Sequence, residues 1–136
     1  MGNIETVKAM YEAFSRGDIP FIVDQLADDV QWEEGGADHG IPWLVPGTGK
    51  AHAIGFFQQI AYFEFHRFEV EAVVGDGDLV VGVCHNDVTV KTTGGHFAGI
   101  ELHVWRFNAE GRVSTFTHVL DTIDHLAAAT KTLQSA

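Results

Sequence analysis

The spacing of the apolar residues changes from mainly helical to strand-like near residue 65 of this chain of 136 residues, and that change constrains the fold more than any other feature. Up to about residue 62 the apolar residues recur at helical intervals, as in the series Ile4, Val7, Met10, Tyr11 and Phe14. From residue 65 onward polar and apolar residues alternate, which predicts strands near 65–74, 79–90, 97–107 and 113–120. Helices that precede consecutive strands with short turns indicate an α+β fold with an antiparallel sheet.

Capping residues mark the expected helix boundaries. Asn3 is expected to cap a first helix that Gly17 terminates, and Asp18 is expected to start a second, shorter helix. Thr48 is expected to cap a third helix that runs to about residue 62. A last helix is predicted over 123–133, after the strands.

A short strand and a long loop are predicted between the second and third helices. Over residues 30–34 the alternation places Trp32 and Glu34 on the same side of the strand. Residues 35–49 are too rich in Gly and Pro for regular structure, yet they include Trp43 and other apolar residues. We interpret this segment as an apolar loop or lid.

The composition is that of a globular protein, with 46% apolar and 20% charged residues, and the length fits one domain over residues 1–136. The net charge of -11 argues against nucleic acid and anionic membranes as partners, because both attract basic patches. No apolar stretch approaches the ~20 residues that span a bilayer, and no signal-peptide pattern is found. The lone Cys84 cannot form an internal disulfide, which favours a cytoplasmic location.

Two histidines on neighbouring predicted strands are the leading candidates for chemistry. If residues 108–111 form a four-residue loop with Gly111 in the left-handed region, His103 faces Phe116 and His118 is its diagonal neighbour on the same face. A three-residue loop would instead shift the register by one residue and separate the histidines. Ionisable groups in an apolar wall are typical of a small-molecule site, although two hydrogen-bonded core histidines are the alternative.

Both faces of the strand predicted at 97–107 are largely apolar, so both sides of the sheet should be covered. The helices and a cavity can cover only one side. We therefore expect a second copy of the chain on the other side, in a homodimer.

Five segments along the chain form a recognisable series: Tyr-Glu-Ala-Phe-Ser-Arg-Gly-Asp at 11–18, Leu-Ala-Asp-Asp-Val-Gln-Trp-Glu-Glu at 26–34, Pro-Gly-Thr-Gly at 46–49, His-Val-Trp-Arg-Phe at 103–107 and Leu-Asp-Thr at 120–122. In order and spacing these segments resemble the nuclear transport factor 2-like superfamily, within its SnoaL-like, ketosteroid isomerase-related branch. The resemblance implies a curved sheet and helices that form a cone around an apolar pocket, commonly dimerised through the outer face of the sheet.

The resemblance also suggests roles for individual residues. Glu34 corresponds to the carboxylate that shuttles the proton in the isomerases. At the position of the isomerases' oxyanion-hole tyrosine this chain has Met10, and Tyr11 is one residue away. His103 matches the histidine of the acid/base pair in SnoaL-like cyclases, and His118 stands where their aspartate is expected. The two positions of the cyclase acid/base pair are therefore kept, but a histidine replaces the aspartate. The changes at the isomerase positions mean that steroid isomerisation is not favoured.

We expect a cofactor-free enzyme that isomerises, cyclises or dehydrates an apolar carbonyl compound by acid/base chemistry. His103 would be the hydrogen-bond donor or acid, and Glu34 or His118 would be the base. Three carboxylates could keep a buried imidazole charged: Glu34, Glu101 and Asp121. Asp121, however, is more typical of a helix cap. The expected ligand-binding wall comprises Met10, Tyr11, Trp32, Trp43, Phe56, His85, Trp105, Phe116 and Leu120. The alternative function is a non-catalytic protein that binds a small molecule, or regulates a partner, through the same pocket.

A zinc site of three histidines that includes His85 and His103 is an alternative, but the spacing of the histidines matches no compact ligand motif. We therefore expect no metal and no cofactor. Cys84 is interpreted as a core residue without a basic neighbour. No role is expected for the remaining histidines, His39, His52, His66, His96 and His125.

Overall fold

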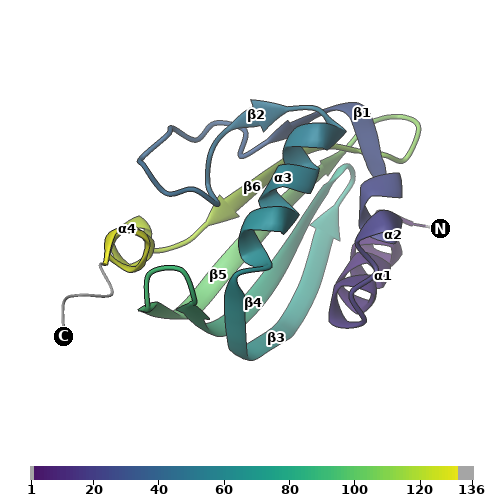
Figure 1. The fold of residues 1–136 in the computed structure, drawn as a ribbon. Coiled ribbons are helices and arrows are strands. Elements are labelled where there is room, and N and C mark those ends of the chain that lie inside the picture. The colour runs from purple at the N-terminus through teal and green to yellow at the C-terminus, as the bar shows by residue number, and fades with distance from the viewer. Residues whose placement is uncertain (1, 132–136) are drawn as a thin grey trace.

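A curved six-stranded sheet forms the framework of the protein, with helices across its concave side and at its ends (Figure 1). The computed structural model describes residues 2–131. The helices are α1 (Asn3–Ser15), α2 (Ile19–Asp24), α3 (Lys50–Ile60) and α4 (Thr122–Thr130). The strands are β1 (Leu26–Trp32), β2 (Gly47–Thr48), β3 (Phe63–Asp76), β4 (Leu79–Val90), β5 (Gly95–Phe107) and β6 (Val113–Val119). The predicted α+β class is confirmed.

The strand order is β2-β1-β6-β5-β4-β3, and β3 to β6 form the predicted antiparallel meander. The sheet as a whole is mixed rather than antiparallel, because β1 runs parallel to β6. This pairing joins segments about eighty residues apart, such as Trp32 with Phe116, and no local pattern predicts it. It places the end of β1 beside the histidine of β6.

The helix caps are partly as predicted. Gly17 ends the first helix region with a φ of 73°, and Asp18 caps α2 by accepting a hydrogen bond from the backbone N–H of Phe21. The caps expected at Asn3 and Thr48 are wrong: α1 begins after Gly2 and α3 begins after Gly49. Gly49 has a φ of 97°, which turns the chain into the helix, while Thr48 pairs with Gln31 in the sheet.

The hairpin between β5 and β6 has His103 directly opposite His118. The predicted register, with His103 opposite Phe116, is wrong by two residues. The shift of two residues has two causes. Phe107 pairs with Val113 rather than Arg112, so the loop is one residue longer than predicted. A bulge after Arg106 shifts the register by one further residue. A shift of two residues keeps each side chain on its side of the sheet, so the two histidines still share one face.

Two apolar clusters fill the space between the sheet and the helices. One joins α1, α2 and α3 to the inner side of the sheet, and the other joins the loop before β2 to β4, β5 and α4. In that loop Trp43 is 5% exposed, so part of the segment 35–49 contributes to the core, as the prediction of an apolar loop implies. The expectation of no regular structure is wrong at residues 47–48, which form β2. Gly95 allows α4 to approach β5, since a Cβ at that position would lie 2.2 Å from the carbonyl oxygen of Ala128.

The last helix is capped by Asp121, whose side chain accepts a hydrogen bond from the N–H of Asp124. It begins one residue earlier than predicted and ends at Thr130, where Lys131 is extended, so the predicted continuation toward residue 133 is wrong; residue 133 itself lies outside the described residues. Within residues 2–131, no helix combines the length and the apolarity needed to cross a bilayer.

Candidate functional site

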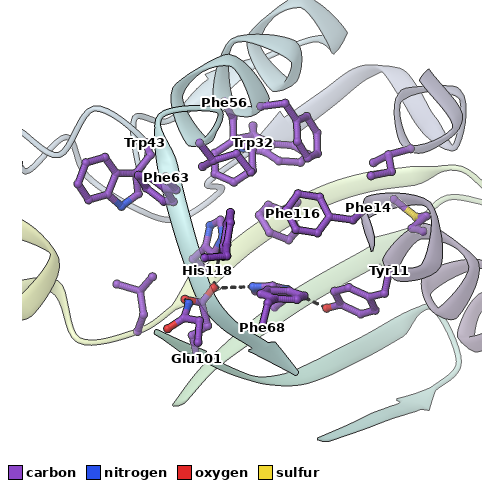
Figure 2. Close-up of a pocket in the computed structure, with 18 of the residues that line it drawn as sticks. Tyr11, Phe14, Trp32, Trp43, Phe56, Phe63, Phe68, Glu101, Phe116 and His118 are labelled. Carbon is purple, nitrogen blue, oxygen red and sulfur yellow. Dashed lines mark hydrogen bonds and ion pairs between the residues drawn. The ribbon is translucent and has the colours of Figure 1, made fainter. Parts of the chain in front are cut away.

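A cavity of about 80 Å³ lies between the inner face of the sheet and the helices, and aromatic side chains make up most of its wall (Figure 2). His103 and His118 both line it. So do eight of the nine residues expected in the ligand-binding wall: Met10, Tyr11, Trp32, Trp43, Phe56, Trp105, Phe116 and Leu120.

His85 does not line the cavity, and its expected place in the wall is wrong. Its neighbours Cys84 and Asn86 are buried on the inner side of β4, so the alternation of the strand directs His85 to the outer side. There its Nε2 lies 2.6 Å from a carboxylate oxygen of Glu71. The β4 residue opposite His103 is Gly82.

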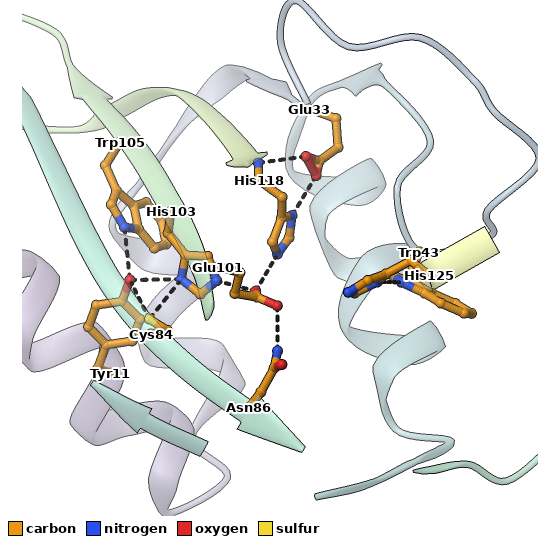
Figure 3. Close-up of polar contacts among 10 residues, drawn as sticks. All are labelled: Tyr11, Glu33, Trp43, Cys84, Asn86, Glu101, His103, Trp105, His118 and His125. Carbon is orange, nitrogen blue, oxygen red and sulfur yellow. Dashed lines mark hydrogen bonds and ion pairs between the residues drawn. The ribbon is translucent and has the colours of Figure 1, made fainter. Parts of the chain in front are cut away.

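His103 is held on both sides of its ring (Figure 3). Its Nε2 lies 2.6 Å from Oε2 of Glu101, and its Nδ1 lies 2.8 Å from the Tyr11 hydroxyl. Residues 101 and 103 are two apart on β5, so both side chains reach the inner face. Gly82 makes room for the phenol, because a Cβ at that position would lie 2.0 Å from Tyr11 Oη.

The electrostatics of this group favour a charged pair. Burial lowers the pKa of His103, but its contacts with Cys84 and Glu101 outweigh burial and raise the pKa to about 10. Burial likewise raises the pKa of Glu101, but the hydrogen bond and positive charge of His103 lower it to about 2. Burial is the main cause of the raised pKa of Tyr11. At neutral pH, an imidazolium therefore faces a carboxylate and a neutral phenol.

His118 is paired with Glu33. One carboxylate oxygen of Glu33 accepts the backbone N–H of His118 at 2.8 Å, and the other lies 2.6 Å from its Nδ1. Because a carboxylate only accepts hydrogen bonds, Nδ1 carries the proton in this pair. The opposite ring nitrogen, Nε2, lies 3.7 Å from Oε2 of Glu101. Glu101 thus lies between the two histidines, and the amide of Asn86 donates to its other oxygen.

Glu34 is not beside Trp32, so the expected placement of this carboxylate is wrong. The strand ends at Trp32, and Glu33 has a φ of 55°, which breaks the alternation and turns the Glu33 side chain inward. Glu33 is 4% exposed, whereas Glu34 lies exposed in the following turn. The Gly-Gly pair at 35–36 is the only signal in the sequence that the strand ends early.

Cys84 and His125 have polar partners that the sequence does not predict. Cys84 is a core residue as predicted, but it does have a basic neighbour, since its Sγ lies 3.6 Å from Nδ1 of His103. His125, for which no role was expected, is buried and accepts a hydrogen bond from the indole of Trp43 at 2.9 Å. Burial lowers the pKa of His125 to about 4.

The model of the SnoaL-like domain matches residues 7–116. A nuclear transport factor 2-like protein of unknown function from Burkholderia pseudomallei is 31% identical over 96% of this chain and 99% of its own, with a TM-score of 0.78. Two more distant structures share the fold. A protein provisionally assigned as a SnoaL-like polyketide cyclase, from Mesorhizobium loti, is 22% identical over 88% of this chain and 100% of its own, with a TM-score of 0.71.

The second is an LEH-like epoxide hydrolase from M. tuberculosis, which is 16% identical over 93% of this chain and 88% of its own, with a TM-score of 0.67. No curated protein matches the chain in sequence. The extent of the domain match and the identity to the B. pseudomallei protein show that this chain belongs to the SnoaL-like domain family of the nuclear transport factor 2-like superfamily.

Proposed function

We propose that this protein is a cofactor-free enzyme that isomerises, cyclises or dehydrates a small apolar carbonyl compound by acid/base chemistry. The observation that carries the proposal is the Glu33–His118 pair, in which a buried carboxylate orients an imidazole that lines an apolar cavity. A carboxylate that fixes the tautomer of a histidine leaves the opposite nitrogen as a base. This arrangement is costly to bury and gives little to a pocket that only binds apolar ligands.

His118 is the proposed base. With the proton on Nδ1, its Nε2 lone pair is available to take a proton from a carbon beside a carbonyl group. Of the two bases expected from the sequence, His118 is supported and Glu34 is not, because Glu34 is exposed outside the cavity wall.

Tyr11 is the proposed hydrogen-bond donor to the substrate carbonyl oxygen, and His103 contacts its hydroxyl. Its hydroxyl oxygen accepts the indole N–H of Trp105 and, when His103 is protonated, the Nδ1–H of His103. Two donors to the oxygen leave the phenol proton free to bond a carbonyl oxygen in the cavity. Because the negative charge of an enolate develops on that oxygen, a donor at this position contributes ~3 kcal/mol to transition-state stabilisation.

The cavity and the family fit a small apolar substrate. Polar side chains gather around Glu101 while aromatic rings form most of the wall, so a ligand with one carbonyl group would be oriented by that end. Structures with this fold include an epoxide hydrolase and a polyketide cyclase candidate, which agrees with an enzyme of this family. The fold alone does not select a reaction, so the side chains carry the proposal.

The test is exchange of the α-hydrogens of cyclohexanone in D2O, followed by NMR with purified protein. We expect the wild-type protein to accelerate exchange and His118→Ala to lower the rate at least ~100-fold, the usual contribution of a positioned base. His96→Ala is the matched control, because His96 is paired with Asp87 on the exposed side of the sheet. Equal rates for wild type and His118→Ala would contradict the proposal.

The binding function is a distinct outcome of the same experiment. A pocket without chemistry would raise the melting temperature in the presence of cyclohexanone but would leave its α-hydrogens unexchanged. That result would favour a small-molecule-binding or regulatory protein over an enzyme.

We further propose a cytoplasmic homodimer that pairs through the outer face of the sheet. The outer side carries exposed or half-buried apolar residues on four strands, among them Val74, Ile100 and Val119, which are 54%, 58% and 51% exposed. A patch of this kind is typical of an interface. The lone cysteine supports the cytoplasmic location. The single domain over residues 1–136 stays a prediction.

A further inference from the structure

Two imidazoles and a carboxylate converge at one point of the cavity wall. Glu101, His103 and His118 each offer one potential metal-binding atom, and these atoms lie within 4.8 Å of one another. Two histidines and one carboxylate form the protein ligand set of several catalytic zinc and non-haem iron sites. All three residues line the cavity, which leaves the remaining coordination positions for water or a ligand.

The spacing is close to what an ion requires. Ligand bonds of about 2.0–2.1 Å in a tetrahedral site place neighbouring ligand atoms about 3.3 Å apart. The distances from Oε2 of Glu101 to Nε2 of His103 and Nε2 of His118 are 2.6 Å and 3.7 Å, and they bracket that value. An ion would replace the proton between His103 and Glu101, and the 2.6 Å contact between their ligand atoms would have to widen toward that value.

Each of the three ligands is also held by a neighbour on its other side. Glu33 bonds Nδ1 of His118, the Tyr11 hydroxyl bonds Nδ1 of His103, and the Asn86 amide bonds the second oxygen of Glu101. Protein metal sites use such outer partners to fix ring orientation and tautomer, and the carboxylate–histidine–metal arrangement is a common form. The carboxylates of Glu33 and Glu101 also supply negative charge that offsets the positive charge of a divalent ion.

We propose that Glu101, His103 and His118 bind one divalent transition-metal ion of the zinc type. Imidazole ligands select zinc, cobalt, iron or nickel over magnesium and calcium. A bound ion occupies Nε2 of His118, the atom proposed above as the base, so metal binding excludes base catalysis by that atom. The inference goes beyond the proposed function, which describes the metal-free protein, because the ion and a substrate proton compete for the same nitrogen.

The test is isothermal titration of the full, chelator-treated chain with ZnCl2, together with the visible absorption spectrum after addition of CoCl2. We expect one ion per chain and the absorption bands of low-coordinate cobalt. His118→Ala should weaken zinc binding at least ~100-fold, and Glu33→Gln should weaken it ~10-fold, the usual effect of losing an outer partner. His96→Ala should leave the affinity unchanged, because His96 belongs to an exposed histidine–carboxylate pair of the same kind.

Equal zinc affinity in wild type and His118→Ala would overturn the proposal, as would a loss of binding in His96→Ala. Circular dichroism checks that each variant is folded, and Glu101→Gln provides a second test of the ligand set if His118→Ala does not fold. The calorimetric readout requires no turnover. A failure of metal binding is therefore distinct from a failure of the exchange assay.

Discussion

Glu33 shows how one backbone angle determines which carboxylate reaches the cavity. A φ of 55° is unfavourable for glutamate and costs of order 1–3 kcal/mol, so surrounding contacts must stabilise it. The two hydrogen bonds from His118 supply that stabilisation, since a hydrogen bond to a charged group contributes about 1.5–3 kcal/mol. The side chain that breaks the strand pattern is thus the one that orients the proposed base.

Gly82 is the second residue on which the site depends. We predict that Gly82→Ala lowers the free energy of unfolding by about 1–3 kcal/mol, because its Cβ would overlap the Tyr11 hydroxyl and the cavity wall must shift. Urea denaturation measures the change. Combining Gly82→Ala with Tyr11→Phe should cost less than the sum of the two, since the second substitution removes the overlapping oxygen.

Gly55→Ala is the control for this experiment. Gly55 lies inside α3, and a Cβ at that position meets no atom within 4 Å, so alanine should be neutral or stabilising there. Additive effects of Gly82→Ala and Tyr11→Phe would contradict the proposed contact.

At the scale of elements, α4 and the loop before β2 meet over one end of the cavity. Trp43 of the loop donates to Nδ1 of His125 on α4, and the His125 ring packs on Phe97 of β5 with centroids 3.8 Å apart. The bond from Trp43 requires an unprotonated Nδ1. Acid therefore removes a bond that joins the two segments.

We predict that stability falls as the pH drops from 6.5 to about 4, because the pKa of His125 is lowered to about 4 in the folded protein and the unfolded chain takes up the proton first. Between pH 7 and pH 5 the loss attributable to His125 is about 2 kcal/mol. Urea denaturation at both pH values should show this loss in the wild type. His125→Gln should not show it, since the amide oxygen still accepts from Trp43 and does not titrate.

His103 and Glu101 change the stability mainly at pH values outside the range 5 to 7. The raised pKa of His103 contributes stability that is complete below pH 6.5 and is lost as the pH rises toward about 10. The lowered pKa of Glu101 contributes stability above pH 4.5 that is lost as the pH falls toward about 2. A wild-type protein and a His125→Gln variant with the same pH dependence between 5 and 7 would contradict the role of His125.

The elements that sequence patterns predict well are those with local causes. Asp18 and Asp121 cap their helices as expected because a capping side chain bonds a backbone N–H only a few residues away. The parallel pairing of β1 with β6 and the bulge after Arg106 are long-range or subtle features, and the sequence does not predict them. Glu33 is missed for the same reason, since its partner His118 is eighty-five residues away.

At the scale of the whole molecule, the outer face of the sheet carries exposed apolar side chains that nothing in the described chain covers. The sheet curves around the cavity, and the helices lie across its concave side and at its ends. Apolar residues such as Ile100 and Val119 are left on the convex side. A second copy would remove them from water without altering either cavity.

We predict that the wild-type protein sediments as a dimer in analytical ultracentrifugation and that Ile100→Glu sediments as a monomer. A charge in the middle of an apolar interface costs several kcal/mol because it is left without a partner. Ile123→Glu is the control, since Ile123 is 82% exposed and belongs to α4 rather than to a strand of the sheet. A wild-type protein that sediments as a monomer would contradict the homodimer.

The turn between the last two strands also limits how this protein can vary. Insertion or deletion of a single residue between Phe107 and Val113 would send His118 to the convex surface while leaving His103 in place, which would dismantle the site without unfolding the sheet. Insertion or deletion of two residues would return the His118 side chain to the same side of the sheet as His103. Relatives that keep the paired rings should accordingly differ in this connection by an even number of residues, counting the loop and any bulge beside it together.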